Sequence, residues 1–110
     1  MNIFNPHEQA QEKIPTNGEV LGVIMRQAEK AVVVRELSDE QGLYFLEAEV
    51  KGEKLGEITR YEYCRKGHFP DGNKSTGTVI HVVFYEGDTA VGGHNIADFN
   101  SETGEWKYTT

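Results

Sequence analysis

The sequence predicts an α+β fold, with one or two N-terminal helices packed on a curved antiparallel sheet of about six strands. Residues 17–30 carry the pattern of an amphipathic helix. From residue 31 onward, short apolar stretches alternate with clusters of Gly, Asp, Asn and Ser, which are typical of turns. The chain has 110 residues and 37% hydrophobic side chains, enough for one core. We therefore expect a single domain over residues 1–110.

Composition narrows the class of protein. No apolar run approaches the length of a membrane span, and the N-terminus lacks a signal-peptide pattern, so no membrane contact is expected. The single cysteine, Cys64, cannot form an internal disulfide, which favours a cytoplasmic protein. The net charge of −7 opposes direct nucleic-acid binding. The charge is uneven, with seven acids and two bases over residues 36–57, and such patches can steer a partner or a second copy.

Two N-terminal segments favour helix. Asn5-Pro6-His7-Glu8 has a capping residue followed by a first-turn proline, which predicts a short helix over about 6–13. A second helix is predicted over about 17–30, where the apolar arc holds Val20, Leu21, Ile24, Met25 and Ala28 and extends to Ala31, whereas Val23 falls outside it. Thr16 and Glu19 have the spacing of a capping box. The alternative is a hairpin that turns at residues 27–30, because the segment is rich in β-branched residues.

The rest of the chain is expected to form strands separated by turns. The predicted strands cover residues 31–37, 43–51, 57–65, 77–86, 89–99 and 105–109. A single helix covering one face of such a sheet is the arrangement of cystatin-like or NTF2-like cones, which we use only as an analogy. The alternative fold is an all-β barrel or sandwich. We find no motif of a known family.

The loop "CRKGHFPDGNKSTGT", residues 64–78, resembles an active-site loop in composition but lacks the spacing. Its residue order is not that of a phosphate-binding loop, and a strand follows it where a helix should. Cys64 and His68 are too few to hold zinc. We therefore interpret this segment as a structural loop, and we expect no metal and no cofactor.

The best candidate for chemistry is the hairpin "VIHVVFYEGDTAVGGHNIADF", residues 79–99. A tight turn at Gly87-Asp88 places His81 directly opposite His94, and opposed imidazoles can act as acid and base. As neighbours they should titrate as a coupled pair, with at least one pKa below about 6.5. Gly92 leaves room for a ligand beside them. A bulge at Gly92-Gly93 would shift the register by one and separate the rings.

Aromatic side chains suggest a second, weaker binding feature. Tyr61, Tyr63 and Arg65 alternate along one strand, and stacked aromatics beside an arginine can bind a flat ligand. Tyr85 is expected on the face of the histidine pair. The competing interpretation of all these aromatic residues is ordinary packing of the sheet.

These observations predict a small acidic binding or protein-interaction domain, with a ligand pocket or interface near His81 and His94. We expect a homodimer, since apolar positions occur on both sheet faces and one helix covers one of them. Besides a second copy of the chain, the expected partners are another protein or a small apolar ligand. The alternative function is a small enzyme that uses the two histidines for proton transfer on an apolar substrate. A further alternative is an acidic protein that occupies the basic groove of a nucleic-acid-handling partner.

Overall fold

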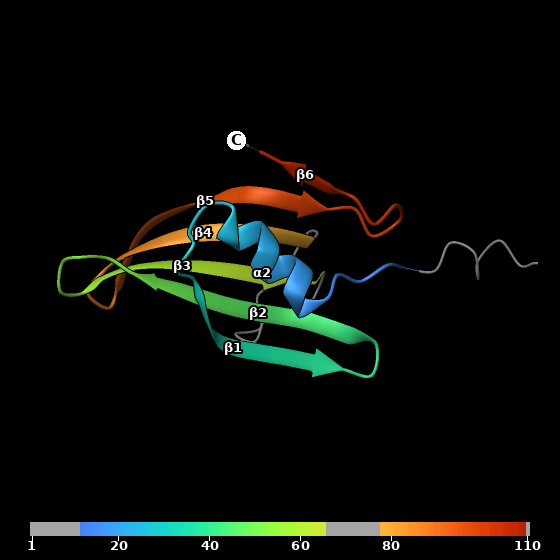
Figure 1. Ribbon diagram of the computed structural model, residues 1–110, viewed down its shortest axis with the longest axis horizontal. Coiled ribbons are helices and arrows are strands. Elements are labelled where there is room, and N and C mark those ends of the chain that lie inside the picture. The colour runs from blue at the N-terminus through green and yellow to red at the C-terminus, as the bar shows by residue number, and fades with distance from the viewer. Residues whose placement is uncertain (1–11, 66–77, 110) are drawn as a thin grey trace, which may run out of the picture.

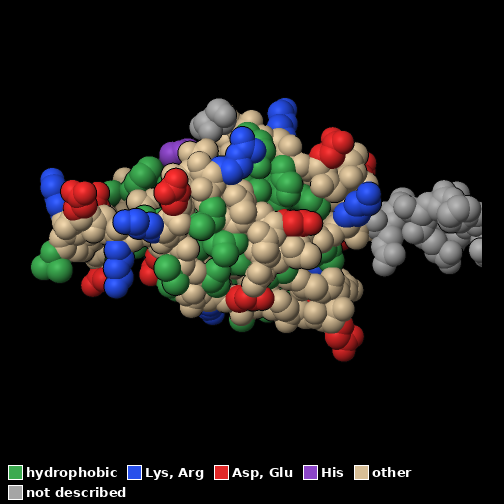
Figure 2. Space-filling model, viewed as in Figure 1, with side chains coloured by type: hydrophobic (Ala, Val, Ile, Leu, Met, Phe, Trp, Pro, Cys, Tyr) green, Lys and Arg blue, Asp and Glu red, His purple; other side chains and the backbone are tan. Residues whose placement is uncertain are grey.

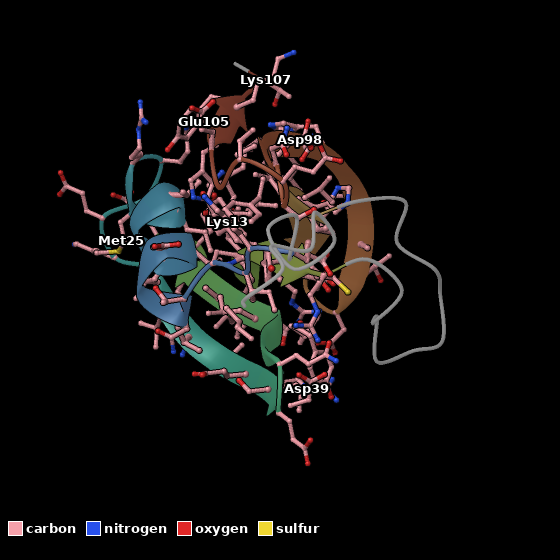
Figure 3. All side chains as sticks on the ribbon, turned by 90° about the vertical axis from the view of Figure 1, so that its right-hand side faces the viewer. Lys13, Met25, Asp39, Asp98, Glu105 and Lys107 are labelled. Atoms are coloured by element: carbon pink, nitrogen blue, oxygen red, sulfur yellow. The ribbon has the colours of Figure 1, made fainter. Side chains whose placement is uncertain are left out.

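The computed structural model describes residues 12–65 and 78–109 and confirms the α+β prediction: one helix precedes an open sheet of six antiparallel strands. Each strand pairs with the next, so β1 and β6 are the two edges (Figure 1). The sheet curves around the helix (Figure 3). The elements are α2 (Asn17–Met25), β1 (Val32–Asp39), β2 (Gly42–Lys51), β3 (Glu57–Cys64), β4 (Thr78–Glu86), β5 (Thr89–Phe99) and β6 (Trp106–Tyr108).

The predicted capping box starts α2. The Thr16 hydroxyl accepts a hydrogen bond from the Glu19 backbone N–H at 3.1 Å, and the Glu19 carboxylate accepts one from the Thr16 N–H at 3.3 Å. These contacts satisfy backbone donors that have no partner within the helix. The prediction placed the end of this helix near residue 30, which is wrong: α2 ends at Met25, and residues 26–30 are mostly turn.

The core lies between α2 and the sheet, but the buried face of the helix differs from the predicted one. Val20 and Ile24 are fully buried, and Val23, which the helical arc left out, is 5% exposed. Met25, predicted to pack on the sheet, is 39% exposed and points away from it (Figure 3). Strands β2 to β5 supply the other buried side chains of the core, which are Leu43, Leu46, Ala48, Tyr61, Tyr63, Ile80, Val82, Ile96 and Ala97.

The β4–β5 hairpin begins in the predicted register and then departs from it. Glu86 pairs with Thr89 and Tyr85 with Ala90, as the Gly87-Asp88 turn requires. The register then shifts by one residue, because Phe84 pairs with Gly92 and leaves Val91 as an extra residue in β5. A second shift follows between His81 and Ile80. Such bulges change which face each later side chain occupies.

Two turns meet at one end of the sheet. The Gly87 backbone N–H donates to the Gly56 carbonyl at 3.1 Å, which joins the β4–β5 turn to the loop between β2 and β3. Both glycines have positive φ, 61° for Gly87 and 81° for Gly56. A β-carbon on Gly56 would lie 3.5 Å from the Gly87 Cα. Glycine therefore suits both positions through its backbone conformation.

Two sequence predictions lie largely outside the described residues. Residues 6–11 of the first predicted helix are not described, and Glu12 and Lys13 are not helical. His68 and the turn over residues 69–73 are also outside the described part of the chain.

Candidate functional site

The predicted pairing of His81 with His94 is wrong. His81 lies opposite Asn95, and His94 lies opposite Val82. Val82 is buried under α2, so His94 belongs to the inner face, which we define as the sheet face toward α2. His81 belongs to the opposite face, which we call the outer face. The one-residue shift at Val91 separates the two rings, since neighbouring registers place side chains on opposite faces.

Each histidine has different surroundings. The His94 ring lies against the Phe84 ring, with 5.7 Å between the centroids. His81 sits between Glu62 of β3 and Asn95 of β5. Burial lowers the pKa of His81 from its usual 6.5, and the charge of Asp98 partly opposes this effect. The cause is therefore removal from water and not a second imidazole.

This shift predicts an acid-sensitive contribution to stability. Because the folded state lowers the pKa of His81, the unfolded chain binds more protons at pH values just below about 6.5. The free energy of unfolding should therefore fall as pH drops below this value. Urea unfolding of the wild type and of His81→Gln across this range measures the effect, and the difference between the two should change with pH. The loss of unfolding free energy at low pH should be larger in Asp98→Asn, because this variant removes the charge that opposes the lowered pKa. Identical pH profiles for wild type and His81→Gln would contradict a lowered pKa of His81 in the folded state.

The predicted aromatic residues are divided between the core and the outer face. Tyr61 and Tyr63 are 5% and 0% exposed and pack under α2, so they offer no ring face to a ligand. Tyr85 lies on the outer face, where its hydroxyl bonds to the Arg60 guanidinium at 2.6 Å. Gly92 is exposed on the inner face opposite Phe84, and no atom lies within 4 Å of the position that a β-carbon would take there. These residues do not form one site.

Arg60 organises the centre of the outer face. Its Nε lies 3.2 Å from Glu47, its Nη2 lies 3.0 Å from Glu49, and its guanidinium stacks 4.3 Å from the centre of the Tyr85 ring. Sequence reasoning did not single out Arg60. Since these contacts occupy the guanidinium from several sides, we interpret the cluster as a structural element of the sheet.

Arg65, directly after β3, is held by an ion pair at the other end of the sheet. Its side chain is 5% exposed, and its Nη2 lies 2.8 Å from the Asp39 carboxylate at the end of β1. Burial acts to raise the pKa of Asp39, but the Gln41 backbone N–H and the charge of Arg65 outweigh it and lower the pKa. This ion pair fixes the end of β1 against β3. In its described contacts, Arg65 therefore has a structural role, which is to hold the end of β1.

The edge strand β1 carries exposed apolar side chains beside a groove. Val32 and Val34 are 62% and 48% exposed, although valine is usually a buried residue. A groove of about 510 Å³ runs beside them, and its lining residues are Lys30, Val32, Val34, Glu49 and Lys51. Glu49 pairs with Arg60, which it shares with Glu47, whereas the two lysines form no salt bridge with any of the described residues. The groove therefore presents apolar side chains flanked by positive charge.

Sequence reasoning missed this surface because three successive valines at 32–34 have the pattern of a buried strand. The available signal was the order of the strands. In a meander, the first strand has a neighbour on one side, so its other side is an edge.

The described residues offer neither a metal centre nor a membrane-spanning helix. No group of three or more His, Cys, Asp or Glu side chains in residues 12–65 and 78–109 is placed to hold a metal ion. No helix in the same part of the chain is long and apolar enough to cross a membrane. Comparison of the chain with protein-family models, curated proteins and solved structures found no match.

Proposed function

We propose that the protein is a binding domain that contacts other polypeptides through the open edge of its sheet, strand β1. The observation that carries this proposal is the exposure of Val32 and Val34, at 62% and 48%, on a strand whose outer edge has no paired neighbour among the described strands. An unpaired edge presents backbone N–H and C=O groups that an added strand can bind. Pockets beside the edge that receive alternate side chains determine which sequence binds.

The groove chemistry supports a particular type of partner. The two valines would receive apolar side chains, and Lys30 and Lys51 would attract a carboxylate. The partner is therefore an extended segment with alternating apolar residues and at least one acid. The enzyme alternative loses its geometric basis, since His81 and His94 occupy opposite faces and cannot act on one substrate group.

The two edges of the sheet differ in a way that favours β1. Strand β6 is three residues long, whereas β1 has eight residues. Very short edge strands are one of the means by which proteins avoid pairing with other chains. Strand β1 contains no proline, and its single arginine, Arg35, lies over the Phe45 ring at 5.6 Å. The long edge therefore lacks proline and is not shortened, although it does carry a bulge at Val34 and the inward-pointing acid Glu36.

A peptide titration tests the proposed function. We expect a heptapeptide of alternating valine and threonine with an aspartate at each end to shift the amide NMR signals of β1 and of residues 49–51. A matched peptide with a lysine at each end should bind more weakly. Val34→Lys should abolish the shifts, because it places a cation in the apolar part of the groove.

Phe84→Lys is the matched control, since Phe84 has a similar exposure of 41% but lies on the inner face. This variant should bind the acidic peptide as the wild type does. Shifts that persist in Val34→Lys, or that centre on the inner face, would contradict β1 as the binding surface.

A further inference from the structure

The facing pattern of β1 is symmetric about its bulge. Val32 pairs with Glu49 and lies on the outer face, whereas Val33 pairs with Ala48 on the inner face. Val34 has no partner in β2, and it lines the outer groove with Val32. The register shift at this point makes two successive residues, 34 and 35, face outward.

Beyond the bulge the pattern runs in reverse. Arg35 pairs with Glu47 on the outer face, and Leu37 pairs with Phe45 on the same face. Glu36 between them points inward, where its carboxylate accepts a hydrogen bond from the Asn17 side chain of α2 at 2.6 Å. The order from residue 32 to 37 is therefore outer, inner, outer, outer, inner, outer. This order is unchanged when the strand is reversed.

We propose that β1 pairs antiparallel with β1 of a second copy of this chain, about a two-fold axis between Val34 and Arg35. This inference rests on the proposed function and names its partner. Directly opposed residues in a continuous sheet must share a face. In a regular strand, neighbouring residues face opposite sides, so a two-fold axis between two neighbours would oppose residues of different faces. Here the bulge makes such an axis possible.

The outer-face side chains that this register brings together are compatible. Val32 meets Leu37 of the second copy on the outer face, which covers one of the exposed valines. Val34 meets the aliphatic part of Arg35, and arginine stems commonly pack on apolar groups. Next to the strand, Lys30 meets Asp39, which also pairs with Arg65 of its own chain, and this opposite-charge contact occurs twice by symmetry.

Charge also favours self-pairing at this edge over other surfaces. The whole chain carries −7, so two copies repel one another in general. Residues 30–39 hold two bases, Lys30 and Arg35, and two acids, Glu36 and Asp39, and are therefore neutral. Their signs are arranged so that the reversed segment places Lys30 beside Asp39. The edge can approach its own copy without the repulsion of the rest of the surface.

The seam is small, which predicts a reversible dimer. Six residues a side lie well below the roughly 20–30 residues a side of a standard stable interface. We therefore expect dimerisation at chain concentrations of roughly tens to hundreds of micromolar.

Sedimentation equilibrium of the full chain over this concentration range is the first test. The wild type should shift from 12.4 kDa towards twice that mass. Val34→Lys should weaken the dimer about tenfold or more, because the new lysine of each copy lies opposite Arg35 of the other and creates two repulsive contacts by symmetry. Val34→Glu should retain the dimer, because the same arginine would pair with it. Phe84→Lys, on the inner face, should behave as the wild type.

Engineered cysteines test the register directly, since the only native cysteine, Cys64, is buried. Val32→Cys/Leu37→Cys should form a covalent dimer under mild oxidation, because the two positions are opposed across the axis. Val32→Cys/Glu36→Cys, with its cysteines on opposite faces, should cross-link much more slowly. Equal cross-linking of both variants, or equal loss of the dimer in Val34→Lys and Val34→Glu, would overturn the proposed register.

The outcomes separate this inference from the proposed function. A chain that stays at 12.4 kDa throughout but still binds the acidic heptapeptide at β1 refutes self-pairing and leaves the binding function standing. A chain that neither dimerises nor binds the peptide refutes both.

Discussion

Replacing Ile24 by aspartate is expected to unfold the protein. Ile24 is fully buried between α2 and the sheet, and none of the described core residues around it carries a charge. An unpaired buried carboxylate costs several kcal/mol, which is comparable to the roughly 5–15 kcal/mol by which domains are stable. Thermal unfolding followed by circular dichroism measures the effect. The milder Ile24→Ala should remain folded and lose about 2–5 kcal/mol.

The neighbouring Met25→Asp variant is the matched control. Met25 is 39% exposed and lies on the solvent side of the same helix, so the substitution should change stability by about 1 kcal/mol or less. The apolar pattern of the sequence placed both side chains in the core, and the structure separates them. If Met25→Asp were as damaging as Ile24→Asp, the observed burial of α2 would be incorrect.

Replacing Gly93 by alanine is expected to destabilise the sheet by about 1–3 kcal/mol. A β-carbon at this position would lie 2.7 Å from the Val82 carbonyl oxygen, which is backbone and cannot rotate away. Strands β4 and β5 would have to move apart where they pair. Urea unfolding monitored by the fluorescence of Trp106 gives the change in the free energy of unfolding.

Gly92→Ala provides the control one residue earlier. No atom lies within 4 Å of the position that its β-carbon would take. Since alanine also restricts the unfolded chain, this variant should be neutral or more stable by up to about 1 kcal/mol. Equal losses at Gly92 and Gly93 would show that the bulged register of β5 is wrong.

The strands could be predicted from the sequence because their signals are local. Each turn contains residues that favour it, such as Gly87-Asp88 between β4 and β5, and each strand lies between two such turns. The capping box of Thr16 and Glu19 fixed the start of α2 for the same reason. The end of α2 had no comparable signal, and Val23 became buried because the sheet curves around the helix.

The histidine pair could not be predicted, because a bulge is a property of two strands together. Counting residues from the turn gives the correct partner for Glu86 and Tyr85, and one extra residue at Val91 then changes every later pair. Gly92-Gly93 indicated that a bulge could occur there but not that it would. The exposure of Val32 and Val34 likewise depends on which strands become edges.

Figure 2 views the molecule from the side of α2 and the inner face, and the hydrophobic side chains visible there lie among charged ones. Phe84 belongs to this face and is 41% exposed. We nevertheless place the binding surface on β1, because β1 combines exposed valines with backbone groups that no described strand pairs, whereas the inner face offers side chains alone.

Amide hydrogen exchange at increasing chain concentration tests the central claim most directly. An edge strand that binds a second strand hides its outward N–H groups from water. We predict that amides of β1 (Val32–Asp39) exchange more slowly as concentration rises, whereas those of the opposite edge, β6 (Trp106–Tyr108), exchange at an unchanged rate. Exchange in β1 that is independent of concentration, while another strand becomes protected, would contradict the assignment of β1 as the contact surface.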